Sequence, residues 1–280
     1  MPKSAKSRKL PITRSGDVAA KRRPLAGPAL IRRFHVLQTA LQAATRKRDA
    51  AQIHSLGEEI DGLGGLQAYQ KSSIAGQDVR RGGDSSKILL SWLKSPTCAV
   101  QIPRVGEQPA KVLELGCLSA ENYISQHPKQ LILTRIDLNA QSAQIQQQDF
   151  LMRPLPAGDG DLFQGISCSL VLNFVPIADR GRFLLHLTAF LPPSADTNHR
   201  HWLFLVLPAP CVVNSRYMTL EILTDMLETV GFTMRESKMT DRMAYWLLER
   251  TGPVKTGKTF KKQEQRKGSN RNNFWIPLQT

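Results

Sequence analysis

The sequence holds few of the residues that build disulfide scaffolds or metal centres. Its 280 residues contain only four cysteines, and none of them forms a CxxC pair or a Cys/His spacing typical of metal ligands. The four are scattered, each within or beside apolar sequence, at Cys98, Cys117, Cys168 and Cys211. This pattern predicts buried, reduced thiols in an intracellular protein, with no metal site.

Long hydrophobic runs are also missing. No apolar stretch approaches the roughly 18 residues of a membrane span, so no transmembrane segment and no membrane partner are expected. The basic N-terminal stretch lacks the apolar segment of a secretory signal. The remaining composition, 41% hydrophobic and 22% charged, is typical of a soluble globular protein.

The charge is unusual in both size and distribution. The formal net charge is +15; residues 1–33 hold ten Lys and Arg against one acid, and residues 250–280 hold eight against one. The rest of the chain carries 20 basic and 21 acidic groups and is about neutral. Basic ends neutralise phosphates by counterion release and so predict affinity for nucleic acid. A nuclear or nucleolar localisation signal is the alternative, and the same residues can serve both.

The pattern divides the chain into four parts. Residues 1–29, rich in Lys, Arg, Ser and Pro, predict a disordered basic tail. Residues 30–97 show apolar positions at helical spacing from Ile31 onward and predict a helical extension or lid. Residues 98–251 predict the globular cofactor-binding domain, and residues 252–280 predict a second basic tail.

Within the globular part, apolar runs alternate with helices or short connections. The predicted strands are 111–115, 131–136, 167–174, 202–207, 232–238 and 243–250. The predicted helices or connections are 119–127, 139–146, 179–191 and 218–230, with a further helix at 87–93. Strands joined by crossovers form a mostly parallel α/β sheet. The short link between the last two strands predicts a terminal antiparallel hairpin, which ordinary dinucleotide-binding domains lack.

Two apolar runs that end in polar residues predict a nucleoside site. Lys111-Val-Leu-Glu-Leu-Gly116 ends in a side-chain-free turn, and the next run ends at Asp137. An acid at a strand tip can hold the hydroxyls of a ribose, although it can also cap the next helix. The turn has one glycine rather than GxGxxG, which favours S-adenosylmethionine over a dinucleotide. Glu114, Gly116 and Asp137 are therefore predicted cofactor residues.

Two later segments offer contacts for an adenine ring. Asp149 and Phe150 could meet the amino group and ring face of the cofactor adenine, or Asp149 could be an ordinary turn residue. Asn173 follows a very apolar run, where its amide can hydrogen-bond a nucleobase edge with Phe174 beside the ring. The alternative is a buried asparagine that closes the strand.

Two polar, glycine- or proline-containing segments complete the predicted rim of the sheet. The first includes Arg81, a candidate for the cofactor carboxylate or a phosphate, although its Gly-Gly-Asp-Ser sequence would also cap a helix. The second contains Asn214 and Arg216, predicted to bind substrate, and Tyr217, predicted to place the base with Asn173 and Phe174. Functional residues gather on such loops.

Together these motifs resemble the fungal 25S ribosomal RNA adenine-N1 methyltransferase family over about residues 30–250. The match runs through Gly64-Gly-Leu-x-x-Tyr-Gln-x-x-Ser-x-x-Gly-Gln77, Arg81-Gly-Gly-Asp-Ser-Ser-Lys87, Trp92-Leu93, Leu113-Glu-x-Gly116, Ile136-Asp-Leu138, Ser169-Leu-Val-Leu-Asn-Phe-Val-Pro176 and Pro210-Cys-x-x-Asn-Ser-Arg-Tyr217. The Arg-Gly-Gly-Asp-Ser-Ser-Lys and Asn-Ser-Arg-Tyr strings are far more specific than the Glu-x-Gly and Asp elements, which very many methyltransferases share. The resemblance implies a seven-stranded Rossmann-like methyltransferase sheet, with cofactor contacts at Gly116 and Asp137. It also implies nucleolar residence and methylation of one adenine of large-subunit RNA.

The expected activity is therefore S-adenosylmethionine-dependent methylation of adenine N1 in ribosomal RNA, by a monomer acting on RNA or a pre-ribosomal particle. A related animal branch senses S-adenosylmethionine without methylating RNA, so a sensor that signals through a partner is the alternative. A methyltransferase acting on protein or a small molecule is a second alternative. The basic ends disfavour both.

Overall fold

The computed structural model describes residues 25–76, 83–193 and 200–280, and its core is one seven-stranded sheet in the order β3-β2-β1-β4-β5-β7-β6. The strands are β1 (Ala110–Leu115), β2 (Leu131–Asp137), β3 (Gln146–Gln147), β4 (Gly165–Ser169), β5 (Trp202–Pro208), β6 (Phe232–Met239) and β7 (Met243–Arg250). The first five run parallel, and β7 is antiparallel to both β5 and β6. The predicted mostly parallel sheet with a terminal antiparallel hairpin is confirmed.

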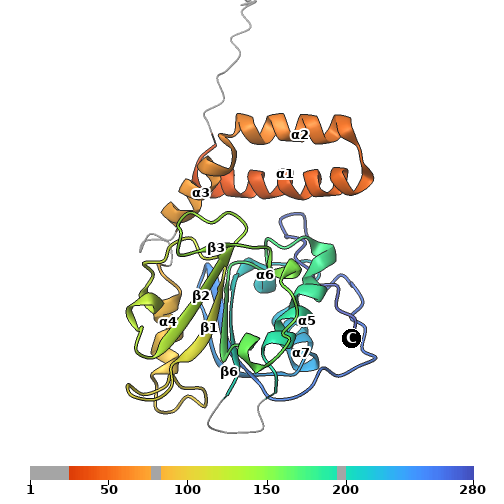
Figure 1. Cartoon of the computed structure of the whole chain (residues 1–280). Helices are drawn as coiled ribbons and strands as arrows, with labels where there is room; N and C mark the ends of the chain where they lie inside the picture. Colours follow the sequence, from red (N-terminus) through yellow and green to blue (C-terminus); the bar gives the residue numbers. More distant parts are fainter. Residues whose placement is uncertain (1–24, 77–82, 194–199) are drawn as a thin grey trace, which may run out of the picture.

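Helices cover both faces of the sheet, with α4 (Ser86–Leu93) on one side and α5 (Arg180–Phe190) and α7 (Leu220–Thr229) on the other (Figure 1). Successive strand residues point to opposite faces, so β5 sends Phe204 into one hydrophobic cluster and Leu205 into the other. The four cysteines are buried and form no disulfide, as predicted. No helix of the described residues is long and apolar enough to cross a membrane.

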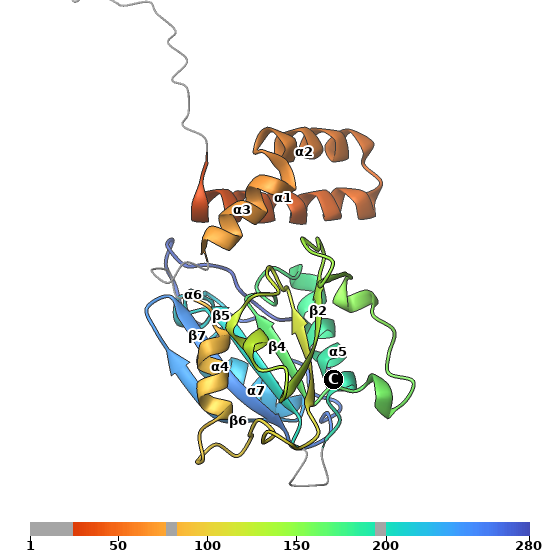
Figure 2. The same cartoon turned by 60° about the vertical axis from the view of Figure 1, so that its left-hand side comes forward.

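Three N-terminal helices, α1 (Gly27–Lys47), α2 (Ala50–Gly62) and α3 (Gly65–Gly76), pack on one another beyond the carboxyl ends of the parallel strands (Figures 1 and 2). The rings of Phe34 and Tyr69 stack at 4.5 Å between centroids and join α1 to α3. These three helices lie in the predicted helical extension, and α1 ends where Arg48 takes a left-handed φ of 56°.

The strand predicted over 167–174 is shorter in the structure. It ends at Ser169, because Leu170 takes a φ of 59° that no strand accommodates. Asn173 therefore lies in the turn that follows β4 rather than on the strand itself. Residues 139–146 form no helix; β3 begins at their end, and η2 (Tyr123–Gln126) is only a short 3-10 helix.

The C-terminal arm, residues 252–280, differs from the predicted basic tail because it packs into the main core. Four of its apolar side chains are buried there: Phe274, Trp275, Ile276 and Leu278. Its lysines remain exposed, so one segment combines a buried apolar run with a charged surface. Charge dominates the composition of the arm and conceals this short apolar run.

Candidate cofactor and adenine site

The backbone of the glycine turn after β1 lies very close to the side chain of Val171. Gly116 has a φ of +67°, and a Cβ at this position would lie 2.5 Å from Cγ2 of Val171. The amides of Gly116 and Cys117 both donate to the carbonyl oxygen of Ile136, at 2.9 and 3.2 Å. Backbone conformation and packing space therefore both require glycine here.

Asp137 ends β2, the strand beside β1, and register aligns Ile136 with Leu115. The tips of these strands are therefore neighbours, and the structure brings Asp137 and Gly116 together. The half-buried carboxylate of Asp137 accepts one hydrogen bond at Oδ1, from the amide of Asn139 at 2.7 Å. Burial raises the pKa of this carboxyl above its ordinary value, although the Asn139 amide lowers it in part.

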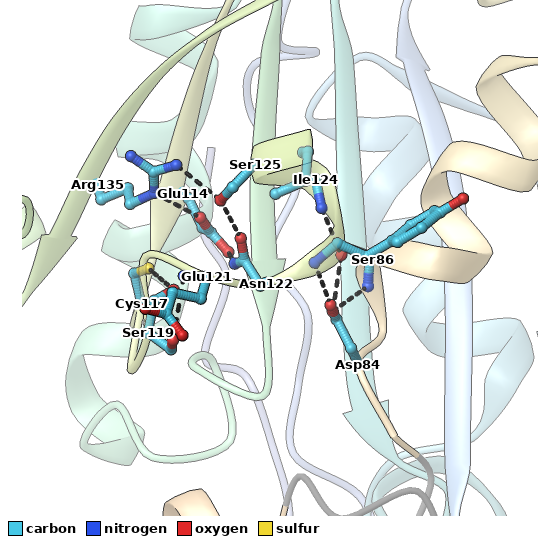
Figure 3. Close-up of polar contacts among 11 residues, drawn as sticks. Asp84, Ser86, Glu114, Cys117, Ser119, Glu121, Asn122, Ile124, Ser125 and Arg135 are labelled. Atoms are coloured by element: carbon cyan, nitrogen blue, oxygen red, sulfur yellow. Dashed lines mark hydrogen bonds and ion pairs between the residues drawn. The ribbon is translucent and has the colours of Figure 1, made fainter. Parts of the chain in front are cut away.

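The side chain of Glu114 faces away from open solvent and belongs to a closed ring of polar contacts (Figure 3). Glu114 accepts from the amide of Asn122, Ser125 donates to Asn122 at 2.5 Å, and Arg135 donates to Ser125 at 2.8 Å. Arg135 Nε lies 3.6 Å from Glu114 Oε2 and closes the ring. Burial raises the pKa of the Glu114 carboxyl more than Cys117, Arg135 and Asn122 lower it.

These contacts hold the loop that follows the Gly116 turn. Glu114 therefore stabilises the turn at the predicted cofactor site. Motif analysis missed Asn122, Ser125 and Arg135. In the sequence, Arg135 lies two residues before Asp137, and the structure pairs it in register with Glu114.

The segment from Asp84 to Ser86 holds three elements together. Asp84 Oδ1 accepts from the amide and hydroxyl of Ser86, at 2.9 and 2.7 Å, and its other oxygen accepts from the amide of Tyr123 (Figure 3). Ser85 and Ser169 share a hydroxyl hydrogen bond of 2.8 Å. The segment thus joins α4, the loop after β1 and the end of β4. Arg81, the predicted cofactor residue of this motif, lies outside the described residues.

Asp149 and Phe150 are neighbours in the sequence, but their side chains lie in different surroundings. The exposed carboxylate of Asp149 accepts from the amide of Leu151 at 2.9 Å, so it caps a short turn. The ring of Phe150 is only 5% exposed and packs edge-on against Phe183 at 5.1 Å and His186 at 4.8 Å. The predicted contact of Phe150 with a cofactor adenine does not fit this structure, because the core already surrounds the ring.

Asn173 and Phe174 lie in the turn between β4 and α5. The Oδ1 atom of Asn173 is buried, and it has no hydrogen-bond partner among the described residues. Such an atom is an acceptor that a bound ligand can satisfy. The ring of Phe174 is 40% exposed, and Ile177 and Val213 also present exposed apolar side chains.

The second rim motif contacts the C-terminal arm. The amide of Asn214 donates to the carbonyl of Asn270 at 3.1 Å and accepts from Arg271 at 3.0 Å. The guanidinium of Arg216 donates to Asn273 Oδ1 and to the carbonyl of Gly268, both at 2.9 Å. These two side chains, predicted to bind substrate, therefore bind the C-terminal arm.

Tyr217 follows this motif and is half-buried. The ammonium of Lys262 lies 4.2 Å from the centroid of its ring, a cation–π contact supplied by the C-terminal arm. Among the described residues, no group of three or more His, Cys, Asp or Glu side chains is arranged to hold a metal ion.

Solved structures with a similar fold include a Burkholderia thailandensis 1,6-didemethyltoxoflavin-N1-methyltransferase with bound S-adenosylhomocysteine. It is 14% identical with a TM-score of 0.47, over 82% of this chain and 92% of that one. A Synechocystis magnesium protoporphyrin IX methyltransferase with bound S-adenosylmethionine is 16% identical with a TM-score of 0.41, over 62% of this chain and 83% of that one.

Sequence relatives are much nearer. The Schizosaccharomyces pombe 25S rRNA adenine-N(1) methyltransferase is 39% identical over 90% of this chain and 92% of its own length. The Saccharomyces cerevisiae 25S rRNA (adenine(2142)-N(1))-methyltransferase is 37% identical over 79% of this chain, and the match spans 62% of its length, less than two thirds. A sequence model of the Bmt2 family, described as 25S rRNA (adenine(2142)-N(1))-methyltransferase, matches residues 54–276. The chain belongs to this family.

Proposed function

We propose that this protein transfers a methyl group from S-adenosylmethionine to the N1 nitrogen of an adenine in 25S ribosomal RNA. The observation that carries the proposal is the Gly116 turn beside the Asp137 carboxylate, in a chain of the Bmt2 family. The S. pombe and S. cerevisiae relatives are both named for this reaction.

The residues at the two strand tips fit S-adenosylmethionine. The turn at Gly116 carries no side chain, and Asp137 has carboxylate lone pairs beyond the one used by Asn139, which ribose hydroxyls can use. A single glycine suits a nucleoside that carries no pyrophosphate. When bound, this cofactor supplies an electrophilic methyl group on a sulfonium.

The protein has to position the acceptor nitrogen but does not have to activate it with a base. Adenine N1 is a neutral lone-pair nucleophile, so the protein needs no strong general base, and correct positioning supplies the rate. Asn173 Oδ1 can accept from the amino group adjacent to N1, and the exposed ring of Phe174 can stack on the base. Because N1 lies on the Watson–Crick edge, the adenine must be unpaired when it enters.

The charged ends supply affinity for RNA that does not depend on base sequence. Exposed lysines of the C-terminal arm, including Lys261, Lys262 and Lys267, lie on the same segment that contacts Tyr217 and Arg216. Electrostatic contact with phosphates is therefore available next to the proposed adenine site. A nucleolar location and a monomeric state are part of the same proposal, and the charge of both ends supports the former.

The test compares large-subunit RNA from cells that carry the wild-type protein, Asp137→Ala or Asp159→Ala. Asp159 is an exposed acid on a short 3-10 turn away from the strand tips and serves as the matched control. Mass spectrometry of RNA digests should show N1-methyladenosine with the wild type and Asp159→Ala, and its loss with Asp137→Ala. Calorimetry on the purified proteins measures S-adenosylmethionine binding separately. A wild type that binds the cofactor but methylates no adenine would be a sensor.

A further inference from the structure

Arg180, at the start of α5, is a buried cation whose hydrogen-bond partners are backbone carbonyls. Its Nη2 donates to Asn173 and its Nε to Val175, both at 2.9 Å, and both acceptors belong to the proposed adenine-placing turn. Its Nη1 donates to Trp275 of the C-terminal arm, also at 2.9 Å, and its guanidinium lies 4.5 Å from the ring centroid of Phe274. Burial lowers the pKa of Arg180 to about 10, so the side chain stays cationic at neutral pH.

The same stretch of the arm is bound to the second rim motif. Ser215 is fully buried; its hydroxyl donates to the carbonyl of Phe274 at 2.7 Å and accepts from the amides of Tyr217 and Met218 at 3.2 Å. The path of contacts from the Asn173 turn to Tyr217 is therefore continuous. It passes through Arg180, two adjacent residues of the arm and Ser215.

The backbone of the arm packs directly against α5 at Gly181. A Cβ on Gly181 would lie 1.9 Å from the carbonyl oxygen of Pro277 and 2.9 Å from its carbonyl carbon. Because the atoms in the way are backbone, a side chain at this position can be accommodated only if the arm moves away. A substitution at Gly181 therefore tests the role of the arm independently of Arg180.

We propose that the C-terminal arm sets the geometry of the adenine side of the site, and that Arg180 is the positioning residue that joins the arm to the Asn173 turn. The inference rests on the proposed function, since it requires Asn173, Phe174 and Tyr217 to receive the adenine. The cofactor side is held by the Glu114–Asn122–Ser125–Arg135 ring, which has no hydrogen bond to the arm among those described. Disturbing the arm should slow methyl transfer and leave cofactor binding intact.

The first test replaces Arg180 with Met or Lys and uses Arg182→Met as the matched control. Arg182 lies on the same helix, and its side chain is 62% exposed. We expect Arg180→Met to lower kcat about 100-fold, the order that a small misplacement of a reactant costs. The Kd for S-adenosylmethionine should stay within about twofold, because the cofactor side keeps its own contacts. Arg180→Lys should recover part of kcat, since lysine keeps the charge but lacks the planar fork.

The second test is Gly181→Ala, which displaces the arm and leaves every donor of Arg180 in place. It should lower kcat in the same way, and the fluorescence of Trp275 should report the exposure of the arm. Leu248→Ala is the control for lost stability, because Leu248 is buried and pairs with Leu203 at the opposite end of β5 from the site. It should lower Tm without lowering kcat at a temperature where it is folded.

The proposal is overturned if Arg180→Met and Gly181→Ala keep kcat within about twofold of an active wild type, which would mean that the turn keeps its geometry without the arm. It is also overturned if cofactor affinity falls in parallel with kcat, or if Leu248→Ala lowers kcat equally. A wild type that binds S-adenosylmethionine and transfers no methyl group is a different result, because it refutes the proposed function itself.

Discussion

Gly116→Ala is the substitution whose cost the structure defines best. A φ of +67° disfavours any residue with a Cβ by about 1–2 kcal/mol. The added methyl would also sit 2.5 Å from Cγ2 of Val171, and relieving that overlap costs about 1–3 kcal/mol more. The free energy of unfolding should therefore fall by about 2–5 kcal/mol, which leaves a domain of ordinary stability folded. Affinity for S-adenosylhomocysteine should fall as well, since the displaced turn is the proposed cofactor contact.

A double-mutant cycle separates the two contributions. Val171→Ala removes the overlapping methyl, so the double variant should regain about 1–3 kcal/mol relative to the sum of the single changes, while the cost of φ remains. Urea unfolding followed by circular dichroism measures each corner of the cycle. Gly57→Ala is the control, because Gly57 lies inside α2 with no atom within 4 Å of its Cβ position and should be neutral or slightly stabilising. A cost below about 1 kcal/mol for Gly116→Ala, or no coupling to Val171, would refute this reasoning.

Two further predictions concern the strand tips. Burial raises the pKa of Asp137, so on acidification the affinity for the cofactor should begin to fall at a higher pH than it would with an exposed aspartate. Calorimetry from about pH 7 to 4 measures this affinity. Asp137→Asn should abolish its pH dependence. The same raised pKa means that the Asp137 contribution to stability decreases as pH rises between its ordinary and raised pKa values, and is constant above them. Arg135→Met should cost about 2–4 kcal/mol in urea unfolding, since it leaves the Glu114 carboxylate, 12% exposed, without its cation. That deficit should shrink on acidification as Glu114 takes up a proton, and a deficit independent of pH would contradict the assignment.

Much of the sheet could be predicted because its information is local. Apolar runs such as those ending at Leu115 and Ile136 carry the periodicity of buried strands, and the lone glycine after β1 has the positive φ that its position in a tight turn suggests. The limits of prediction also have local causes. Leu170 ends β4 by adopting a left-handed φ, and a leucine in the sequence does not predict this conformation.

The residues of the site differ in how much of their environment could be predicted from the sequence. Gly116 and Asp137 could be recognised because each follows directly from the end of its own strand. Asn214 and Arg216 are predicted substrate ligands because they are polar and lie on a loop at the rim. Their partners lie 52 to 57 residues further along the chain, so no local pattern could show that these side chains contact the C-terminal arm.

The strand tips, the alternation that builds the sheet and the concentration of positive charge at both ends can be recognised without the structure. These properties depend on the order and spacing of neighbouring residues. That the C-terminal arm belongs to the core, and that Arg180 and Ser215 connect it to two turns of the site, depends on packing between distant parts of the chain. The reason is physical: whether a polar group meets solvent or a distant carbonyl depends on how the chain packs, and burial of Phe274 and Trp275 brings those carbonyls into place.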